Sequence, residues 1–387
     1  MKVLYISRVN PFINGGGPFA SRAYIDAFME LSEHFTLMIA DNCIVPDNYK
    51  QSADIVYVPK RPFKEKLLFP FTGRLHRFIP FIYNYWQNIN EGRFDTVVLN
   101  GGVLAGDMVD FFKSKKLKVI TIHHNVERRY HKDNKTIESF GGLYAGYINK
   151  NEKKALLNSN LNLSISNDDI QEFKDIYDLP ENIRLKYLGC FENKERRTEN
   201  ILLQPDNCTL AITGSLHDYQ TEDGITHFLK ELYTPIISKY PDINIIIAGR
   251  NPGKKLIEKC KRSNIELIAN PENMDAVIKK SSVYIAPARL GSGLKLRVMD
   301  GLRNGKAILT HPTSAKGYDL FHNKDYFKQY HSVEDFMEKL DYLLNNQFNP
   351  LCIKTDYEKY FSFLSGLERL KVILNEELNN ESTIYKS

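Results

Sequence analysis

The chain has 387 residues, of which 42% are hydrophobic and 26% charged, and its formal net charge at pH 7 is +5. This length predicts two domains rather than one, and the weak positive balance excludes a chain that binds nucleic acid over its whole surface. No apolar stretch is long enough to cross a bilayer, and the first residues run into a predicted strand rather than a signal peptide. The five cysteines have no paired spacing, so we expect a cytoplasmic protein without disulfides or a zinc site.

Short apolar runs alternate with helical patterns in the first half of the chain, which is typical of a parallel sheet covered by helices. Strands are predicted over residues 3–7, 35–40, 54–58, 96–99, 118–123, 161–164 and 184–187. Helices are predicted over residues 20–31, 103–113, 137–158 and 168–176. The polar stretch 190–207 then indicates an interdomain linker.

A second alternating series follows this linker. Its strands are predicted over residues 209–213, 244–248, 265–268, 282–286 and 307–309. Its helices are predicted over residues 224–239, 253–262, 274–280, 294–304, 332–345 and 357–378. The fold class is therefore α/β, with doubly wound domains over residues 1–190 and 208–354. Such sheets bind ligands at the carboxyl ends of their strands, so we expect the active site there.

The stretch 60–90 holds six basic residues, one acidic residue and Trp86, the only tryptophan, among many aromatic residues. Basic and aromatic residues mixed in this way suit a segment that lies on anionic lipid headgroups. An ordinary helix packed on a sheet, with its cations in solvent, explains the pattern equally well.

Three consecutive glycines, Gly15, Gly16 and Gly17, precede the first predicted helix and allow a ligand to approach the backbone. Residues 15–20 also match the dinucleotide fingerprint G-x-G-x-x-A. That fingerprint requires its first glycine directly after the strand, whereas residues 8–14 intervene here. We therefore expect no NAD, and we expect the glycines to lie in a flexible loop beside a cleft.

Polar side chains gather at the end of the predicted strand 118–123, where His123, His124, Asn125 and Glu127 occur. A histidine there can hydrogen-bond a substrate hydroxyl or a departing phosphate, and Glu127 can accept from an alcohol. Neighbouring side chains of an extended chain point in opposite directions, so at most one histidine is expected to serve. We favour His124, because His123 lies closer to the strand and fits a hydrogen-bonded core residue. No ligand spacing indicates a metal.

The strongest signal is the loop after the predicted strand 282–286. Gly291 and Gly293 precede a helix predicted from Leu294, and the free N–H groups and dipole of such a helix N-terminus suit a phosphate. The cations Arg289 and Lys295 flank the glycines and suit a diphosphate. The alternative is that the glycines only make a tight turn.

Other polar residues complete this predicted pocket. Asp300 lies further along the predicted helix, at a spacing that suits ribose hydroxyls. Gly214 and Ser215 follow one predicted strand and Arg250 follows the next, so all three are candidates to line the same nucleotide site. The alternative for each of these loops is a strand-to-helix turn without a ligand.

The segments that carry a family resemblance are the triple glycine, HHNVERRY, TGSLHDYQTEDGITHFLKELYTPI, IIIAGRNP and ARLGSGLKLRVMDGLRNGKAIL. Across nearly its whole length, the chain resembles the family-four glycosyltransferases of the GT-B fold. The resemblance implies two Rossmann-like domains facing each other across a cleft, with a C-terminal helix, 355–387, completing the first. It implies retaining transfer from a nucleotide diphosphate sugar without metal or cofactor. The chain also lacks any Asp-x-Asp, the manganese–diphosphate clamp of the other large class of sugar transferases.

By position, the resemblance assigns Lys295, Leu294 and the amides of 291–293 to the diphosphate. It assigns Asp300 to the ribose, where the family usually has glutamate, and His124 to the reacting sugar. Asn125 and Glu127 are the candidates for the acceptor.

Gly16 and Gly17 match the family's loop beside the phosphates and acceptor. Three positions depart from the family pattern. Ser292 replaces a glutamate of many members, although branches with a Gly-Ser-Gly loop lack it too. Asp300 is one methylene shorter than the usual glutamate. Ser215 stands in a loop that usually carries an arginine and a lysine.

The expected acceptor is a growing glycan, on a lipid carrier, in bacterial surface polysaccharide synthesis. The stretch 60–90 would then hold the enzyme peripherally at the inner face of the membrane. Two other classes stay open. A sugar-nucleotide epimerase would turn over the donor without an acceptor, and a non-catalytic partner subunit would bind nucleotide poorly and associate with an active homologue.

Overall fold

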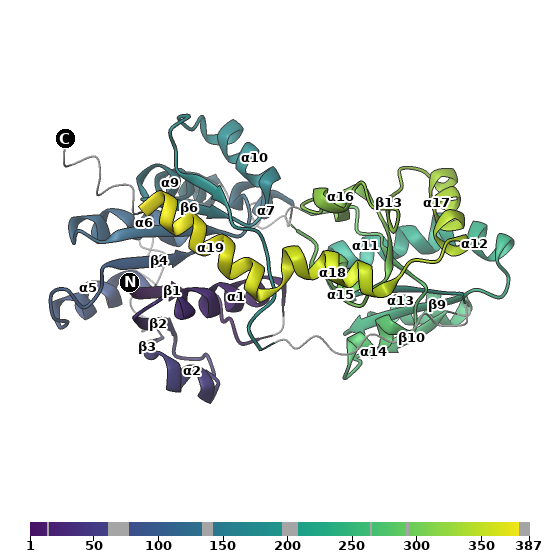
Figure 1. The fold of residues 1–387 in the computed structure, drawn as a ribbon, viewed down its shortest axis with the longest axis horizontal. Coiled ribbons are helices and arrows are strands. Elements are labelled where there is room, and N and C mark those ends of the chain that lie inside the picture. Colours follow the sequence, from purple (N-terminus) through teal and green to yellow (C-terminus); the bar gives the residue numbers. More distant parts are fainter. Residues whose placement is uncertain are drawn as a thin grey trace. The chain divides into compact units, whose positions relative to one another are not determined.

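A computed structural model describes residues 1–13, 15–60, 77–133, 142–195, 208–263, 265–291 and 294–378. The chain divides into two compact units (Figure 1). Unit 1 comprises Met1–Arg196 and Ser362–Ser387, and unit 2 comprises Arg197–Phe361. Most of the predicted linker, residues 61–76 of the basic stretch, and Ser292 and Gly293 lie outside the described residues.

Unit 1 is built on a seven-stranded parallel sheet with the order β3-β2-β1-β4-β5-β6-β7. Its strands are β1 (Lys2–Ser7), β2 (His34–Ala40), β3 (Asp54–Val58), β4 (Thr96–Asn100), β5 (Lys118–His123), β6 (Leu161–Ser164) and β7 (Leu185–Tyr187). Its helices are α1 (Gly16–Glu30), α2 (Asp47–Ser52), α5 (Phe78–Gln87), α6 (Gly102–Ser114), α7 (Glu127–Asp133), α9 (Gly142–Asn158), α10 (Asn167–Tyr177) and α19 (Phe363–Leu378). Every residue of β4 is buried, as expected where helices cover both faces of a parallel sheet.

Unit 2 is built on a six-stranded parallel sheet with the order β10-β9-β8-β11-β12-β13. Its strands are β8 (Thr209–Ser215), β9 (Asn244–Arg250), β10 (Glu266–Ala269), β11 (Val283–Ala286), β12 (Ala307–Thr310) and β13 (Phe327–Gln329). Its α-helices are α11 (Tyr219–His227), α12 (Tyr233–Lys239), α13 (Lys254–Arg262), α14 (Met274–Lys279), α15 (Leu296–Arg303), α16 (Pro312–Ala315), α17 (Val333–Asn345) and α18 (Pro350–Phe361). A short π-helix over Phe228–Leu232 joins α11 to α12, and a short 3₁₀ helix covers Asp319–Phe321. The predicted α/β fold of two doubly wound domains is confirmed.

Two of the differences between the predicted and observed elements bear on the site and on the domain boundary. Gly16 and Gly17 form the first turn of α1 rather than a flexible loop, because burial of the helix face that includes Tyr24 and Phe28 outweighs the low helix propensity of glycine. The single helix predicted over 357–378 is two helices that meet at Ser362. The earlier helix, α18, packs against α15 and belongs to unit 2, so the chain returns to unit 1 at Ser362 rather than at 355.

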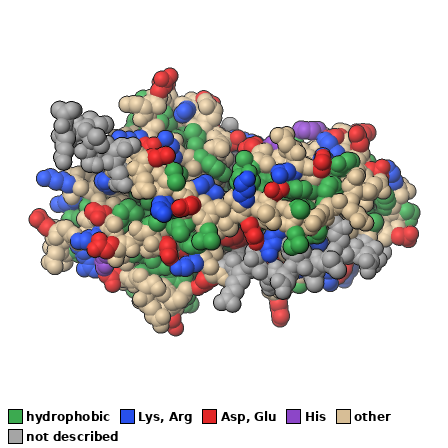
Figure 2. Space-filling model, in the orientation of Figure 1, with side chains coloured by type: hydrophobic (Ala, Val, Ile, Leu, Met, Phe, Trp, Pro, Cys, Tyr) green, Lys and Arg blue, Asp and Glu red, His purple; other side chains and the backbone are tan. Residues whose placement is uncertain are grey.

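The surface carries charges of both signs. On the face drawn in Figure 2, basic and acidic side chains of the described residues are interspersed, and neither sign forms a continuous patch there. This distribution agrees with the small net charge of the chain.

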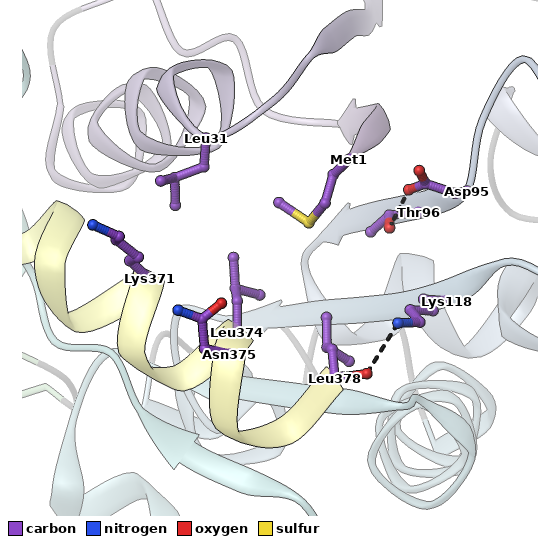
Figure 3. A pocket seen from close by; sticks show the side chains of 9 residues that line it. All are labelled: Met1, Leu31, Asp95, Thr96, Lys118, Lys371, Leu374, Asn375 and Leu378. Carbon is purple, nitrogen blue, oxygen red and sulfur yellow. Dashed lines mark hydrogen bonds between the residues drawn. The ribbon is translucent and has the colours of Figure 1, made fainter. Parts of the chain in front are cut away.

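Helix α19 completes unit 1. Leu370, Leu374 and Leu378 are buried, and the Arg369 Nε donates to the carbonyl oxygen of Leu188 over 3.0 Å. Near the end of the helix, the Lys118 Nζ donates to the Leu378 carbonyl oxygen over 3.0 Å (Figure 3). A cavity of about 460 Å³ lies between α19, the end of α1 and the amino ends of β1, β4 and β5.

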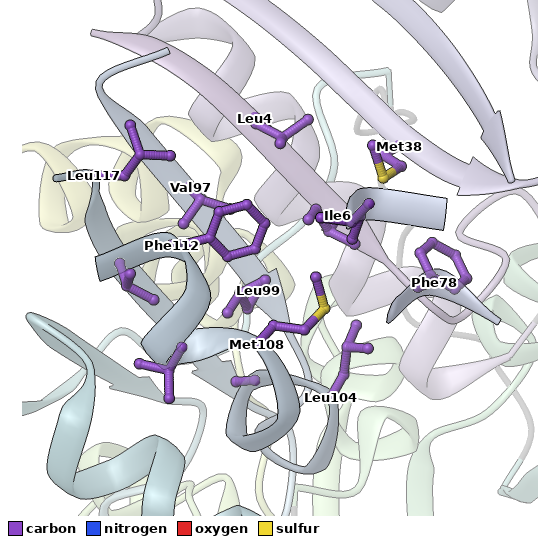
Figure 4. Close-up of a cluster of buried hydrophobic side chains, with 14 of the residues drawn as sticks. Leu4, Ile6, Met38, Phe78, Val97, Leu99, Leu104, Met108, Phe112 and Leu117 are labelled. Atoms are coloured by element: carbon purple, nitrogen blue, oxygen red, sulfur yellow. The ribbon is translucent and has the colours of Figure 1, made fainter. Parts of the chain in front are cut away.

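Helix α5 covers residues 78–87 of the basic, aromatic stretch 60–90. Phe78, Ile79 and Ile82 are buried in the core with side chains of β1, β2, β4 and α6. In Figure 4, Phe78 lies beside Ile6 of β1 and Met38 of β2. For residues 78–87, the structure therefore supports the interpretation as a helix packed on a sheet.

Candidate functional site

In unit 1, polar side chains meet at the carboxyl edge of the sheet. The neighbouring strands β1, β4 and β5 end at Ser7, Asn100 and His123, and their parallel register brings these ends together. Gly101, with φ 120°, turns the chain after β4 into α6, a backbone angle that favours glycine. His124 follows β5 directly and lies at this edge.

A directional chain of hydrogen bonds links His124 to the other strands. The His124 Nε2 lies 2.5 Å from the Asn100 Oδ1. The Asn100 Nδ2 donates to the Ser7 Oγ over 3.1 Å and to the Ser21 Oγ over 2.9 Å. The Ser7 Oγ in turn donates to the carbonyl oxygen of Val9 over 2.8 Å. Sequence analysis missed Asn100, Ser7 and Ser21.

His124 is uncharged at neutral pH in this environment. Burial lowers the pKa of its imidazole to about 4, against a smaller opposing effect of the Glu127 charge. Its ring lies 5.8 Å from the ring of Tyr24 on α1. The second ring nitrogen, Nδ1, is buried and has no hydrogen-bond partner among the described residues.

His123 is a core residue. It is 1% exposed, its Nε2 lies 3.0 Å from the Asn162 Oδ1, and its ring makes an edge contact with Phe173 at 5.0 Å. Burial lowers its pKa to about 4 as well. His123 thus lies in the core, whereas His124 is partly buried at the carboxyl edge of the sheet, and its role in binding stays a prediction.

Asn125 and Glu127 lie where the chain turns from β5 into α7. Both are partly buried. The backbone N–H of Glu127 donates over 2.9 Å to the Oε1 of Glu152, a fully buried carboxyl group on α9. The phenol of Tyr177 donates to the Glu152 Oε2 over 2.6 Å. Glu152, which sequence analysis also missed, fixes the segment that carries His124 to Glu127.

In unit 2, Gly214, Ser215 and Arg250 lie at the carboxyl ends of β8 and β9, which pair along their length. A Cβ on Gly249 would come within 1.9 Å of the Gly214 carbonyl oxygen, so the two strand ends approach closely. The Ser215 Oγ lies 3.3 Å from the His217 Nδ1. These residues lie at the edge where sequence analysis expected them.

Helix α11 engages both predicted phosphate-binding cations. The Arg289 guanidinium donates to Asp223 through Nε at 3.1 Å and Nη2 at 2.9 Å. The Lys295 Nζ donates to the Gln220 Oε1 over 3.1 Å. Sequence analysis did not identify Asp223 or Gln220, although both lie in the segment that opens the second domain.

The glycine loop lies against this helix. Gly291 has φ 92°, and a Cβ there would come within 2.3 Å of the Gln220 carboxamide. Helix α15 begins at Leu296, two residues later than predicted, with Lys295 at its N-cap position. Leu294 lies beside Gly317, and the phenol of Tyr318 donates to the Lys295 carbonyl oxygen over 2.8 Å.

Asp300 is held by neighbouring arginines. Its Oδ2 lies 3.0 Å from the Arg297 Nη1 and its Oδ1 lies 3.1 Å from the Arg303 Nη2. Arg303 also binds Asp275. A ribose hydroxyl that binds Asp300 must therefore share this carboxylate with the two arginines. The i, i+3 spacing of these residues on one helix was a usable signal for the ion pairs.

The described residues contain neither a candidate metal site nor a helix that could cross a membrane. No group of three or more His, Cys, Asp or Glu residues in those ranges is arranged to hold a metal ion. Among the helices of the same ranges, none is both long and apolar enough to span a membrane.

Residues 207–346 match the family model described as "Glycosyl transferases group 1". A curated relative, an uncharacterized 44.6 kDa protein in the cps region of Klebsiella pneumoniae, is 26% identical over 126 residues, which are 30% of this chain. The match spans about a third (32%) of the length of that relative. Unit 2 thus contains a glycosyltransferase group 1 domain.

Solved structures resemble the chain over almost its full length. A glycosyltransferase from Rickettsia africae has a TM-score of 0.67 at 12% identity, covering 98% of each chain. HepE from Anabaena in complex with UDP has a TM-score of 0.68 at 9% identity, covering 97% of this chain and 100% of HepE. The lipopolysaccharide outer core galactosyltransferase WaaB has a TM-score of 0.64 at 11% identity, covering 98% of this chain and 100% of WaaB. These likenesses show that the fold is GT-B.

Proposed function

We propose that this protein is a retaining glycosyltransferase that moves a sugar from a nucleoside diphosphate sugar to a glycan or lipid-linked acceptor. The observation that carries the proposal is the glycosyltransferase group 1 domain, whose match includes the Gly-Ser-Gly loop and Lys295. The GT-B fold and the complexes of HepE with UDP and with UDP-glucose support a UDP-sugar as the first donor to test. The relative from the cps region of Klebsiella pneumoniae and the galactosyltransferase WaaB support a role in surface polysaccharide synthesis.

The proposed chemistry needs positive charge where the diphosphate leaves. Negative charge develops on the diphosphate as the bond to the sugar breaks, so fixed cations and backbone N–H groups stabilise the transition state most. We assign this role to Lys295 and to the backbone of 291–294. The Lys295 Nζ donates to the Gln220 carboxamide, which holds the ammonium group beside the glycine loop. No metal ion takes part in this proposal.

The remaining contacts with the donor and the acceptor are assigned from the places of the candidate residues in the sequence. We assign the ribose to Asp300, and we assign Gly214, Ser215, Arg250 and Arg289 to the remainder of the donor. In unit 1, we assign the sugar to His124, the acceptor to Asn125 and Glu127, and the donor phosphates to Gly16 and Gly17.

The test combines nucleotide binding and turnover. Thermal unfolding is measured with UDP, GDP, CMP, dTDP and NAD, because a ligand that binds only the folded state raises the midpoint. One nucleoside diphosphate should raise it, and Lys295→Ala should abolish that shift and lower kcat on the order of 10²–10³-fold, as for other groups that stabilise a transition-state charge. The control is Lys261→Ala, at an exposed position of α13 in the same unit.

Three outcomes contradict the proposal. Equal turnover of Lys295→Ala and the wild type would remove the assigned role of Lys295. Binding of none of the nucleotides would favour a non-catalytic partner subunit, and donor turnover without an acceptor would favour an epimerase.

We also propose that the protein associates peripherally with the inner face of the membrane, where a lipid-linked acceptor would be available. Basic residues between 61 and 76 would supply the attraction to anionic headgroups. Flotation with vesicles that contain phosphatidylglycerol, compared with phosphatidylcholine alone, tests this. Equal flotation in both would contradict it.

A further inference from the structure

The amide of Asn100 has only one orientation that satisfies its neighbours. An asparagine carboxamide can be turned over without changing its shape, so the direction of its hydrogen bonds must come from the network. The hydroxyl hydrogen of Ser7 is used on the Val9 carbonyl oxygen, 2.8 Å away. The Ser7 oxygen must therefore accept from Asn100, which places the NH₂ group toward Ser7 and Ser21 and the carbonyl oxygen toward His124.

This orientation decides which nitrogen of His124 carries the hydrogen. The Asn100 Oδ1 has no hydrogen to give, so the His124 Nε2 must donate. A neutral imidazole carries a single N–H, and the His124 Nδ1 is then a lone-pair acceptor. In this structure the Nδ1 atoms of His123 and His124 are both buried without a partner among the described residues, but only His124 is a partly exposed residue at the edge of the sheet. Leaving such a polar atom unpaired is unfavourable, and a hydrogen-bond donor placed there would remove that cost.

We infer that Asn100 is a positioning residue, which holds the His124 ring with its hydrogen on Nε2 and so presents Nδ1 as an acceptor to a hydroxyl or amide N–H of the substrate. The inference rests on the proposed function for the identity of the substrate as a sugar. The hydrogen on Nε2 distinguishes the two partners considered for His124, a substrate hydroxyl and a departing phosphate. A sugar hydroxyl can donate to Nδ1, whereas an ionised diphosphate has no hydrogen to give.

The surroundings of His124 keep this state over a wide pH range. Three titratable side chains of the described residues face the ring: Tyr24 from α1, His123 from β5 and Glu127 from α7. Burial outweighs the Glu127 charge and lowers the pKa of His124 to about 4. The ring therefore stays neutral from pH 5 upward, and Nδ1 keeps its lone pair.

A spectroscopic measurement tests the inference without any assay of activity. Protein labelled with ¹⁵N-histidine is examined by NMR at pH 7.5, and the signals of His124 are assigned with His124→Gln. We expect a protonated Nε2 and an unprotonated Nδ1. A hydrogen on Nδ1, in either the neutral or the charged ring, would overturn the inference even if the enzyme is active.

Asn100→Asp is the variant that probes the positioning role. It keeps the size of the side chain but places a carboxylate beside the Nε2 hydrogen, which should raise the pKa of His124. The ring then takes up a second hydrogen, on Nδ1, as the pH falls. We expect kcat of the variant to fall about tenfold for each pH unit below the new pKa, while kcat of the wild type stays level from pH 8 to 6.

The neighbouring histidine offers a matched control. Asn162 accepts from His123 in the same way, since its Nδ2 donates to the Leu156 carbonyl oxygen over 2.8 Å. Asn162→Asp should lower stability but leave the pH dependence of kcat like that of the wild type. A wild-type pH profile in Asn100→Asp, or the same altered profile in both variants, would overturn the inference. If no UDP-, GDP- or dTDP-linked sugar reacts with the wild type, the proposed function fails. The hydrogen position found by NMR still decides the role of Asn100.

Discussion

Glu152 is a carboxyl group with almost no access to water. It is 0% exposed on α9 and accepts hydrogen bonds from the Glu127 backbone and the Tyr177 phenol. Burial raises its pKa from the usual 4.5 to about 8, more than these hydrogen bonds lower it. The folded protein therefore binds this proton more tightly than the unfolded chain does.

The sign of the resulting pH dependence follows from linkage. Because the pKa is higher in the folded state, the stabilising contribution is complete below pH 4.5 and is lost as the pH rises through 8. We expect the free energy of unfolding of the wild type, relative to Glu152→Gln, to decrease on the order of 2–4 kcal/mol between pH 5 and 8. Urea unfolding at three pH values measures it.

An exposed glutamate provides the control for this measurement. Glu181→Gln makes the same chemical change at an exposed position of the same unit and is measured at the same pH values. Parallel curves for the wild type and Glu152→Gln would contradict the assignment of a raised pKa.

The burial of a site residue could be predicted only where its own position in a strand determines it. The position of His123 within β5 was enough to predict that it lies in the core, while the role of His124 stays a prediction. The role of Asn100 depends on a hydroxyl of β1 and another of α1, which no local pattern connects to it. The partners of Arg289 and Lys295, Asp223 and Gln220, likewise come from a distant helix.

At the scale of elements, α6 and α9 pack at a glycine. A Cβ on Gly106 would lie 2.1 Å from the Asn151 carbonyl oxygen, so backbone meets backbone there. A methyl group cannot be accommodated by rotating a side chain, and the two helices must separate. Asp107 and Asp110 of α6 bind side chains of α9 across the same interface.

Gly106→Ala should therefore destabilise unit 1 by about 1–3 kcal/mol, the range for overpacked cores. Gly146→Ala, on α9, is the matched change, because nothing lies within 4 Å of its added methyl group. It should stabilise the protein by about 0.5–1 kcal/mol through helix propensity. Urea unfolding of the two variants measures both effects, and effects of the same sign would contradict the packing argument.

Elements were predictable where burial produced a regular pattern. The strand predicted over 118–123 agrees with β5 at both ends, since hydrophobic runs in buried parallel strands are unambiguous. The three-residue strand β13 was too short to show a pattern. The break at Ser362 was missed because apolar residues continue at helical spacing on both sides of it.

At the scale of the whole molecule, the chain enters unit 2 and returns. Unit 1 consists of Met1–Arg196 and Ser362–Ser387, so its last described helix, α19, comes after all of unit 2. A glycine of α19, Gly366, lies directly against the Phe191 ring, and Arg369 lies over that ring at 6.0 Å. The segment of unit 1 that precedes unit 2 in the chain therefore packs against the segment that follows unit 2.

The stability of unit 1 should depend on α19. Leu370→Ala removes a side chain that is 0% exposed and should cost about 2–5 kcal/mol, as for other buried leucines. Leu364→Ala, on the same helix but 73% exposed, should cost almost nothing. Fluorescence of Trp86 during urea unfolding follows unit 1 selectively, because the only tryptophan lies on α5. Equal unfolding of both variants would contradict this role of α19.

The return of the chain also sets an order of events during translation. The ribosome makes all of unit 2 before it makes the helix that closes the sheet of unit 1. At about 5–20 residues per second, the roughly 180 residues between Arg196 and Leu378 take on the order of 10–40 s to synthesise. During that time nascent unit 1 exposes the apolar surface that Leu370, Leu374 and Leu378 later cover. That surface is where a chaperone would bind the growing chain.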